Sequence, residues 1–163
     1  AVAGLGADVS LDAMLVRDTT SRSDGKSGFG IGLTYDPSTA APSHGTVTHS
    51  HPAWTLGGLL PAKYIIHAVG PVWGDGDEDK KLSDAVTGSL RVADELKCKS
   101  ISMPAISTGI FGFPKDRAAK IIFSAIEAYF TEVKNSTIQT VRLVLFDDAT
   151  VKVFLDIWGS TSS

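Results

Sequence analysis

The stretch that decides the fold is Pro104-Ala105-Ile106-Ser107-Thr108-Gly109-Ile110-Phe111-Gly112-Phe113-Pro114. It follows a short apolar segment, residues 101–103, and precedes a helical pattern that begins at Lys115. A strand, a loop with two glycines and two hydroxyls, and then a helix are typical of an anion-binding site in α/β proteins. Glycine lets backbone N–H groups approach a phosphate closely, and the helix N-terminus carries a partial positive charge. We therefore expect the charged part of a ligand to lie at this loop.

The segments around this loop alternate between strand and helix patterns. Residues 64–69 predict a strand that ends at Gly70-Pro71, and residues 138–146 predict a second, strongly apolar strand. Apolar residues recur at helical spacing over three ranges, which are 82–96, 118–133 and 151–158. Such alternation predicts an α/β fold with a largely parallel sheet covered on both faces.

The first sixty residues are less regular. Residues 9–16 fit a strand through the alternation of Val9, Leu11, Ala13 and Leu15, and they fit a helix equally well. Residues 19–43 are rich in Ser, Thr, Gly, Asp and Pro and predict a loop. A connection of that length inside a compact domain usually carries function or is mobile.

Composition narrows the class of protein. The chain has 163 residues, of which 43% are hydrophobic, so one domain with a proper core is expected. The formal net charge of −3 disfavours a broad nucleic-acid-binding surface, and no apolar run is long enough to span a membrane. Cys98 is the only cysteine, which excludes an internal disulfide and fits an intracellular protein. His44, His49 and His51 lie close together without a cysteine or acidic partner, so we expect no metal site.

A second motif, Leu-Pro-Ala-Lys-Tyr-Ile-Ile-His-Ala-Val-Gly-Pro-Val-Trp, occupies residues 60–73 and precedes the loop 104–114. The two motifs at this distance resemble the macrodomain family. The strand pattern at 140–147 is similar to that of macro-histone variants. The resemblance implies one macrodomain over residues 1–158, with 1–43 divergent, a clear match over 44–158 and a flexible tail at 159–163. It also implies a three-layer α/β/α fold with a mixed, mostly parallel central sheet.

The same resemblance implies the ligand and its surroundings. The expected partner is ADP-ribose, free or attached to a protein, and no further cofactor is expected. A monomeric domain in the nucleus or cytoplasm, without direct nucleic-acid or membrane contacts, fits this family. The residues expected to bind the ligand are Ala105, Ser107, Thr108, Gly109, Ile110, Phe111, Gly112, Phe113, Phe146 and Asp147.

Each part of ADP-ribose has an expected partner in that set. The backbone of residues 107–113 supplies donors for the diphosphate, and the hydroxyls of Ser107 and Thr108 add to them. Phe111 and Phe113 cover the distal ribose or form a wall beside the phosphates. Phe146 packs against the adenine or, in the alternative, closes the hydrophobic core. Asp147 accepts from a ribose hydroxyl or, together with Asp148, caps the last helix.

The chain departs from macrodomains that hydrolyse ADP-ribosyl bonds. Those carry an asparagine-containing motif after the second strand and then a run of three glycines, and neither is found here. In one register, residues 11–16 form that strand, and Arg17, Asp18 and Thr19 replace the asparagine motif. In a second register, residues 5–16 form the helix that follows the glycines.

Both registers lack the asparagine, so we expect no catalytic residue. The preferred hypothesis is a non-catalytic ADP-ribose-binding module. The alternative is an ADP-ribosyl hydrolase or O-acetyl-ADP-ribose deacetylase with a diverged first loop. A third hypothesis is an interaction domain that has lost the ligand.

Overall fold

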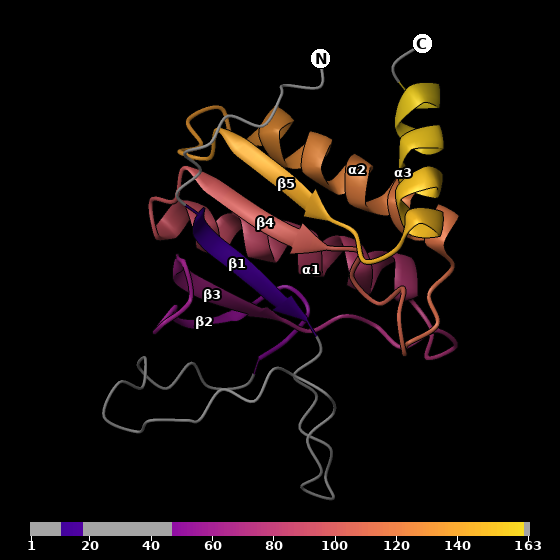
Figure 1. Ribbon diagram of the computed structural model, residues 1–163, viewed down its shortest axis with the longest axis horizontal. Coiled ribbons are helices and arrows are strands. Elements are labelled where there is room, and N and C mark those ends of the chain that lie inside the picture. The colour runs from indigo at the N-terminus through magenta and orange to yellow at the C-terminus, as the bar shows by residue number, and fades with distance from the viewer. Residues whose placement is uncertain (1–10, 18–46, 162–163) are drawn as a thin grey trace, which may run out of the picture.

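A computed structural model describes residues 11–17 by their backbone and residues 47–161 (Figure 1). The helices are α1 (Glu78–Glu95), α2 (Lys115–Glu132) and α3 (Asp148–Thr161). The strands are β1 (Leu11–Arg17), β2 (Ala53–Leu56), β3 (Ala62–Ala68), β4 (Ser100–Pro104) and β5 (Thr140–Val144).

The strands form one mixed sheet in the order β2-β3-β1-β4-β5. β1 lies in the centre and is parallel to β3 and β4, with Met14 opposite both Ile65 and Ser102. β5 is parallel to β4, whereas β2 is antiparallel to β3. The expected mixed, mostly parallel α/β fold is therefore confirmed. The placement of β1 also decides between the two registers, because residues 11–17 form a strand and the helix proposed for residues 5–16 is wrong there.

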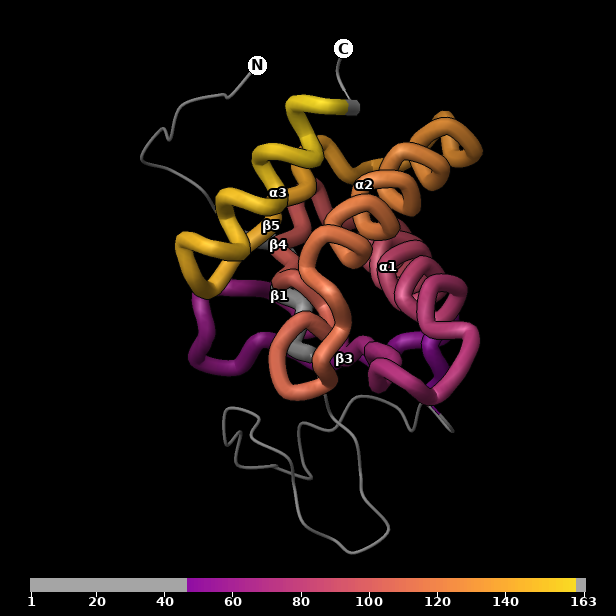
Figure 2. The backbone as a smooth tube through the Cα atoms, turned by 90° about the vertical axis from the view of Figure 1, so that its right-hand side faces the viewer, coloured from indigo at the N-terminus to yellow at the C-terminus, as the bar shows by residue number. Residues whose placement is uncertain are grey.

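Parallel pairing brings four strand ends to one side of the sheet. β3, β1, β4 and β5 all run in the same direction, so their carboxyl ends share one edge. We call this the carboxyl edge, and it consists of residues 69–77, 105–114 and 145–147 together with the end of β1. Figure 2 shows the molecule from this side. The glycine-containing loop at residues 104–114 lies at this edge, between β4 and α2.

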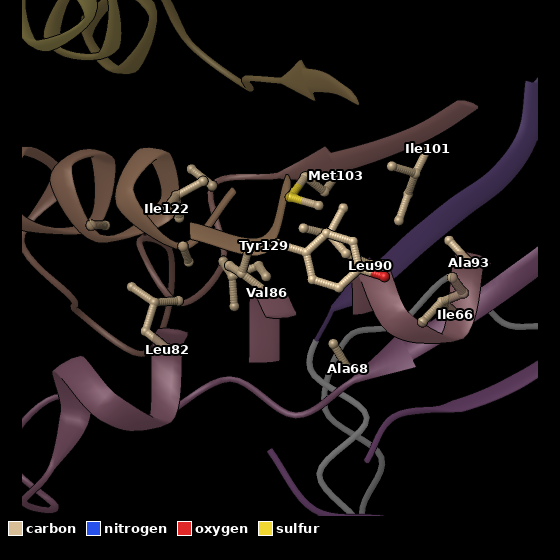
Figure 3. Close-up of a cluster of buried hydrophobic side chains, with 14 of the residues drawn as sticks. Ile66, Ala68, Leu82, Val86, Leu90, Ala93, Ile101, Met103, Ile122 and Tyr129 are labelled. Carbon is tan, nitrogen blue, oxygen red and sulfur yellow. The ribbon is translucent and has the colours of Figure 1, made fainter. Parts of the chain in front are cut away.

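Two long helices cover one face of the sheet. α1 and α2 lie side by side behind the strands in Figure 1 and bury an apolar stripe each. Figure 3 shows that their side chains meet Ile101 and Met103 of β4. The members of this core that the figure labels are Ile66, Ala68, Leu82, Val86, Leu90, Ala93, Ile101, Met103, Ile122 and Tyr129. The predicted helices at 82–96 and 118–133 are thus α1 and α2.

The last helix lies at the β5 edge and packs against α2. The ring of Phe123 contacts Phe154 and Trp158 of α3, at centroid distances of 5.7 and 5.2 Å. α3 continues to Thr161, which is three residues beyond the end predicted at Trp158. The start of the expected flexible tail at residue 159 is therefore helical, and residues 162–163 lie outside the described part of the chain.

A carboxylate joins three elements at the opposite edge of the sheet. Asp94, near the end of α1, accepts hydrogen bonds from the Tyr129 hydroxyl at 2.6 Å and the Thr137 amide at 2.6 Å. Burial alone would raise the pKa of Asp94, but the hydrogen bonds from Tyr129, Ser136 and Thr137 outweigh burial and lower it. The ionised carboxylate therefore links α1, α2 and the turn before β5.

Close packing at Gly88 generates a stability prediction. A Cβ at this position of α1 would lie 2.6 Å from the Ser50 carbonyl oxygen and 2.9 Å from Pro52 Cδ. We expect Gly88→Ala to lower the free energy of unfolding by about 1–3 kcal/mol, because backbone must move to admit the methyl group. Gly159 of α3 has open space around it, so Gly159→Ala should raise stability by about 0.5 kcal/mol. Urea unfolding measures both, and equal stability of the two variants would contradict the packing argument.

Candidate ligand-binding site

The loop after β4 is folded by its own backbone hydrogen bonds. The Gly112 amide donates to the Gly109 carbonyl at 3.0 Å, and the Phe113 amide donates to the Ser107 carbonyl at 3.0 Å. Within residues 47–161, no group accepts a hydrogen bond from the amides of Gly109, Ile110 and Phe111. These three consecutive donors precede α2, whose N-terminus adds a partial positive charge. The loop is therefore arranged to receive an anion.

Two residues of the loop have positive φ angles. Gly112 has φ 69°, which glycine adopts without strain. Ser107 has φ 64°, which is uncommon for a residue with a Cβ atom and costs about 1–3 kcal/mol. Its side chain is fully buried, and the Oγ has no hydrogen-bond partner among residues 47–161. Both the backbone strain and the unpaired hydroxyl of Ser107 lower the stability of the fold, so Ser107 is not retained for stability.

The other predicted residues of this loop differ in exposure. Ala105 is buried, and its carbonyl accepts from the Thr108 hydroxyl at 2.8 Å, so the Thr108 hydroxyl hydrogen is used inside the loop. Ile110 is 91% exposed and Phe111 is half-buried. Phe113 belongs to the hydrophobic core. The structure thus leaves Phe111 as the more accessible of the two phenylalanines that were predicted to flank a ligand.

The loop after β5 brings the remaining two predicted residues to the carboxyl edge. Phe146 is 93% exposed, so it does not close the core as one alternative supposed. The Asp147 carboxylate accepts from the Thr150 amide at 2.7 Å and the Thr150 hydroxyl at 2.8 Å, and it therefore caps α3. The amide hydrogen bond from Thr150 and the neighbouring Lys115 lower the pKa of Asp147.

An ion pair joins this loop to the start of α2. Lys115 Nζ lies 3.2 Å from Asp147 Oδ1. Since Lys115 is the first residue of α2, Phe146 and Asp147 lie on the same side of the sheet as residues 105–114. The site residues predicted after β4 and after β5 are therefore brought together at the carboxyl edge.

A contact that the sequence analysis missed lies beside the loop. The Trp73 amide, after β3, donates to the Phe111 carbonyl at 2.9 Å. The ring of Trp73 packs edge-on against Phe113, with centroids 5.0 Å apart. The motif that ends in Trp73 marked the family, but its backbone contact with Phe111 joins positions too far apart in the sequence for a local pattern to show.

Other polar groups have ordinary structural partners. His49 Nδ1 donates to the Val69 carbonyl at 2.8 Å, and His67 Nε2 lies 3.0 Å from the Thr55 hydroxyl. Cys98 is buried. In the described ranges, no three His, Cys, Asp or Glu side chains are placed to hold a metal ion, and His44 falls outside those ranges. None of the helices in that part of the chain is long and apolar enough to cross a membrane.

A polar cavity of about 320 Å³ lies away from the loop. It is bounded by the ends of α1 and α2 and by the turn before β5, at the edge opposite the carboxyl edge. Asp94 and Tyr129, which already bond to each other, form part of its wall. The acidic residues in its wall, Asp94, Glu95 and Glu132, outnumber the basic ones, so the cavity suits an anion less well than the loop does.

The buried hydroxyl of Ser107 generates a second prediction. Removing an unpaired buried hydroxyl stabilises the ligand-free chain, because the group lost its hydration on folding and gained no partner. We expect Ser107→Ala to raise the free energy of unfolding by about 1 kcal/mol, with the φ strain unchanged. Urea unfolding without ligand measures this. A loss of stability would mean that the hydroxyl has a partner.

Comparison with known proteins identifies the family. The model of the Macro domain family matches residues 31–122, whereas the sequence motifs predicted a clear match over 44–158. An uncharacterized protein of Thermotoga maritima is 51% identical over 102 residues, which is 61% of this chain and 17% of that protein. A macro domain-containing protein of Caldanaerobacter subterraneus is 45% identical over 106 residues, which is 64% of this chain and 59% of that protein.

An O-acetyl-ADP-ribose deacetylase of Klebsiella pneumoniae is 39% identical over 112 residues, which is 68% of this chain and 63% of that protein. The chain thus spans less than two thirds of each of these three relatives. All three are bacterial, so they give no support to the nuclear location that was expected.

Solved structures agree with this result. The Oceanobacillus iheyensis macrodomain with ADP has a TM-score of 0.75 and 23% identity, with 94% of this chain and 86% of that chain covered. The Trypanosoma brucei macrodomain in complex with ADP-ribose has a TM-score of 0.61 and 26% identity, with 66% of this chain and 45% of that chain covered. The first likeness shows the fold alone. Together with the match to the family model, which covers more than half of the sequence, these findings show that the chain belongs to the Macro domain family.

Proposed function

We propose that the chain binds ADP-ribose, free or attached to a protein, through the loop at residues 105–113. The observation that carries this proposal is the run of three backbone amides, at Gly109, Ile110 and Phe111, that have no acceptor among the described residues. The loop precedes the N-terminus of an 18-residue helix, α2. Backbone donors at a helix N-terminus suit a diphosphate, because they concentrate partial positive charge without a basic side chain.

The surroundings of these donors support the same ligand. The chain carries a net charge of −3, so a diphosphate needs a local source of positive potential rather than general attraction. Lys115, the first residue of α2, adds positive charge near the loop. Phosphate oxygens are strong acceptors and suit the free amides of Gly109, Ile110 and Phe111.

The nucleoside end of the ligand fits the loop after β5. The exposed ring of Phe146 offers an apolar face for the adenine base. Asp147 uses Oδ1 to cap α3, but a carboxylate has further lone pairs, so Oδ2 can accept from a ribose hydroxyl beside Lys115. ADP-ribose spans the carboxyl edge from residues 145–147 to residues 105–113 in this arrangement.

The proposal extends to binding without hydrolysis. The sequence contains one asparagine, Asn135, which lies in the turn before β5. Because β4 and β5 are parallel, the start of β5 and the end of β4 lie at opposite edges of the sheet. Asn135 therefore cannot reach the loop, and this chain supplies no asparagine at the carboxyl edge. Hydrolysis needs a water held in one geometry, which binding through backbone amides does not provide.

A second candidate function is hydrolysis of O-acetyl-ADP-ribose or of an ADP-ribosyl bond. The similarity to proteins named O-acetyl-ADP-ribose deacetylase favours it. In that case Asp18 or Asp24, which are the first two acidic residues after β1 in the sequence and lie outside the described residues, are the candidate bases. An interaction domain without a ligand is the third hypothesis, and it predicts no nucleotide binding.

Calorimetric titration tests the binding proposal. We expect one ADP-ribose per chain, and we expect Gly109→Glu to lower the affinity by at least about 100-fold, because its carboxylate would repel the diphosphate at short range. Gly159→Glu is the matched control, since it adds the same charge in open space on α3 and should bind as the unchanged chain does. Absence of heat with the unchanged chain would favour the interaction domain, and full affinity in Gly109→Glu would exclude the loop assignment.

Two substrates test the absence of catalysis. We expect no release of the label from mono-ADP-ribosylated protein and no acetate from O-acetyl-ADP-ribose during hours of incubation with an equimolar amount of the chain. Chromatography of the nucleotide products and an acetate assay measure both reactions. Release of either product, abolished again by Gly109→Glu, would refute the non-catalytic proposal and establish the second candidate.

A further inference from the structure

We propose that Asp79, Arg117 and Trp73 form a latch that holds the loop at residues 105–113 in its ligand-binding shape. The three residues come from the first turn of α1, the first turn of α2 and the segment after β3. They are positioning residues, because their contacts are with the loop and with one another. The effect on ligand affinity rests on the proposed function, whereas the effect on the loop does not.

Trp73 is the member that contacts the loop directly. Its amide donates to the Phe111 carbonyl at 2.9 Å, which fixes the middle of the loop. Its ring packs edge-on against Phe113, which is buried at the end of the loop. Its Cβ lies 4.0 Å from the place where a Cβ of Gly112 would be, so the loop passes closely over Trp73. Displacing Trp73 would therefore release the segment that carries the free amides.

Arg117 also contacts the ring of Trp73. Its guanidinium lies 5.3 Å from the centre of the Trp73 ring, which is within the range of a cation–π contact. The same guanidinium donates two hydrogen bonds to Asp79, with both Nε and Nη2 2.7 Å from a carboxylate oxygen. A planar guanidinium can stack on a ring and bind a carboxylate in the same plane, which an ammonium group cannot do. Asp79 therefore fixes Arg117 over Trp73.

Glu78 ties the segment that follows Trp73 to α1, so that the latch residues are not displaced together. Its carboxylate accepts from the Gly74 amide at 2.8 Å and the Gly76 amide at 3.1 Å. The segment between Trp73 and α1 is thus tied to the first turn of that helix. The latch is therefore anchored on α1 through Glu78 and Asp79, and Arg117 of α2 completes its contacts.

Exposure and helix position indicate that the ion pair acts on the loop rather than on global stability. The side chains of Asp79 and Arg117 are 47% and 52% exposed, and exposed pairs contribute little to unfolding free energy. A base in the first turn of a helix is also disfavoured by the helix dipole. Asp79 offsets that cost, and the same pair orders the neighbouring loop.

Hydrogen exchange in the ligand-free chain tests the latch by itself. We expect Arg117→Gln and Asp79→Asn each to speed the exchange of the Trp73, Gly112 and Phe113 amides by about fivefold, measured by NMR. The matched controls remove the exposed pair between Lys80 and Asp84 on α1, whose atoms are 2.5 Å apart. Lys80→Gln and Asp84→Asn should leave these rates within about twofold. Unchanged rates in both latch variants would refute the latch.

The affinity for ADP-ribose tests the consequence for the ligand. We expect Arg117→Gln and Asp79→Asn both to weaken binding by about fivefold, with the two control variants unchanged. If Arg117 instead attracts the diphosphate by its charge alone, Asp79→Asn would tighten binding, because a negative charge is removed beside the ligand. Tighter binding in Asp79→Asn would therefore overturn the proposal.

The two measurements separate the latch from the proposed function. If the unchanged chain binds no ADP-ribose while exchange responds as expected, the latch stands and the proposed function fails. If the unchanged chain binds ADP-ribose and the latch variants bind it equally well, the function stands and the role of the latch in binding is refuted. Arg117→Lys adds a final check, because it keeps the charge but loses the two-bond, stacked geometry and should behave as Arg117→Gln does.

Discussion

The parallel pairing of β1 with both β3 and β4 is the constraint on which the rest of the structure depends. It sets the direction of the central strands, and β5 follows β4 in the same direction. Their carboxyl ends must then meet at one edge, whatever the loops contain. The three loops that carry Trp73, Phe111 and Phe146 are adjacent for this reason. A reversal of β1 would separate the contacts from which the site is built.

The carboxyl edge contains some residues that stabilise the fold and others that lower its stability. Phe113 and Ala105 are buried and bind the loop at 105–113 to the core, while the amides of Gly109, Ile110 and Phe111 have no acceptor among the described residues. Ser107 adds backbone strain and an unpaired hydroxyl. Such costs persist only where the surrounding structure enforces them, and the contacts of Trp73 with Phe111 and Phe113 supply that enforcement. The loop is therefore held in shape before any ligand arrives, which lowers the entropy cost of binding.

Periodicity and turn residues were enough to predict most of the fold. The apolar spacing of α1 and α2 and the glycine loop between β4 and α2 are local signals, so one sequence reveals them. The roles of single side chains could not be predicted from such local signals. Whether Phe146 faced the core or solvent depended on the path of the chain after β5, and the contact of Arg117 with Asp79 joins residues 38 positions apart. No pattern within a loop or helix carries that information.

Binding and catalysis make different demands on this edge, and that difference explains how a chain can keep one without the other. The donors proposed for the diphosphate are main-chain amides, which every residue except proline provides, so the loop tolerates change as long as its path is kept. Catalysis needs one side chain at one position, oriented to hold a water. Asn135 has the right chemistry but lies where β5 begins, and parallel pairing with β4 keeps it at the far edge. The geometry that assembles the loop proposed to bind ADP-ribose is therefore the same geometry that keeps this asparagine away from it.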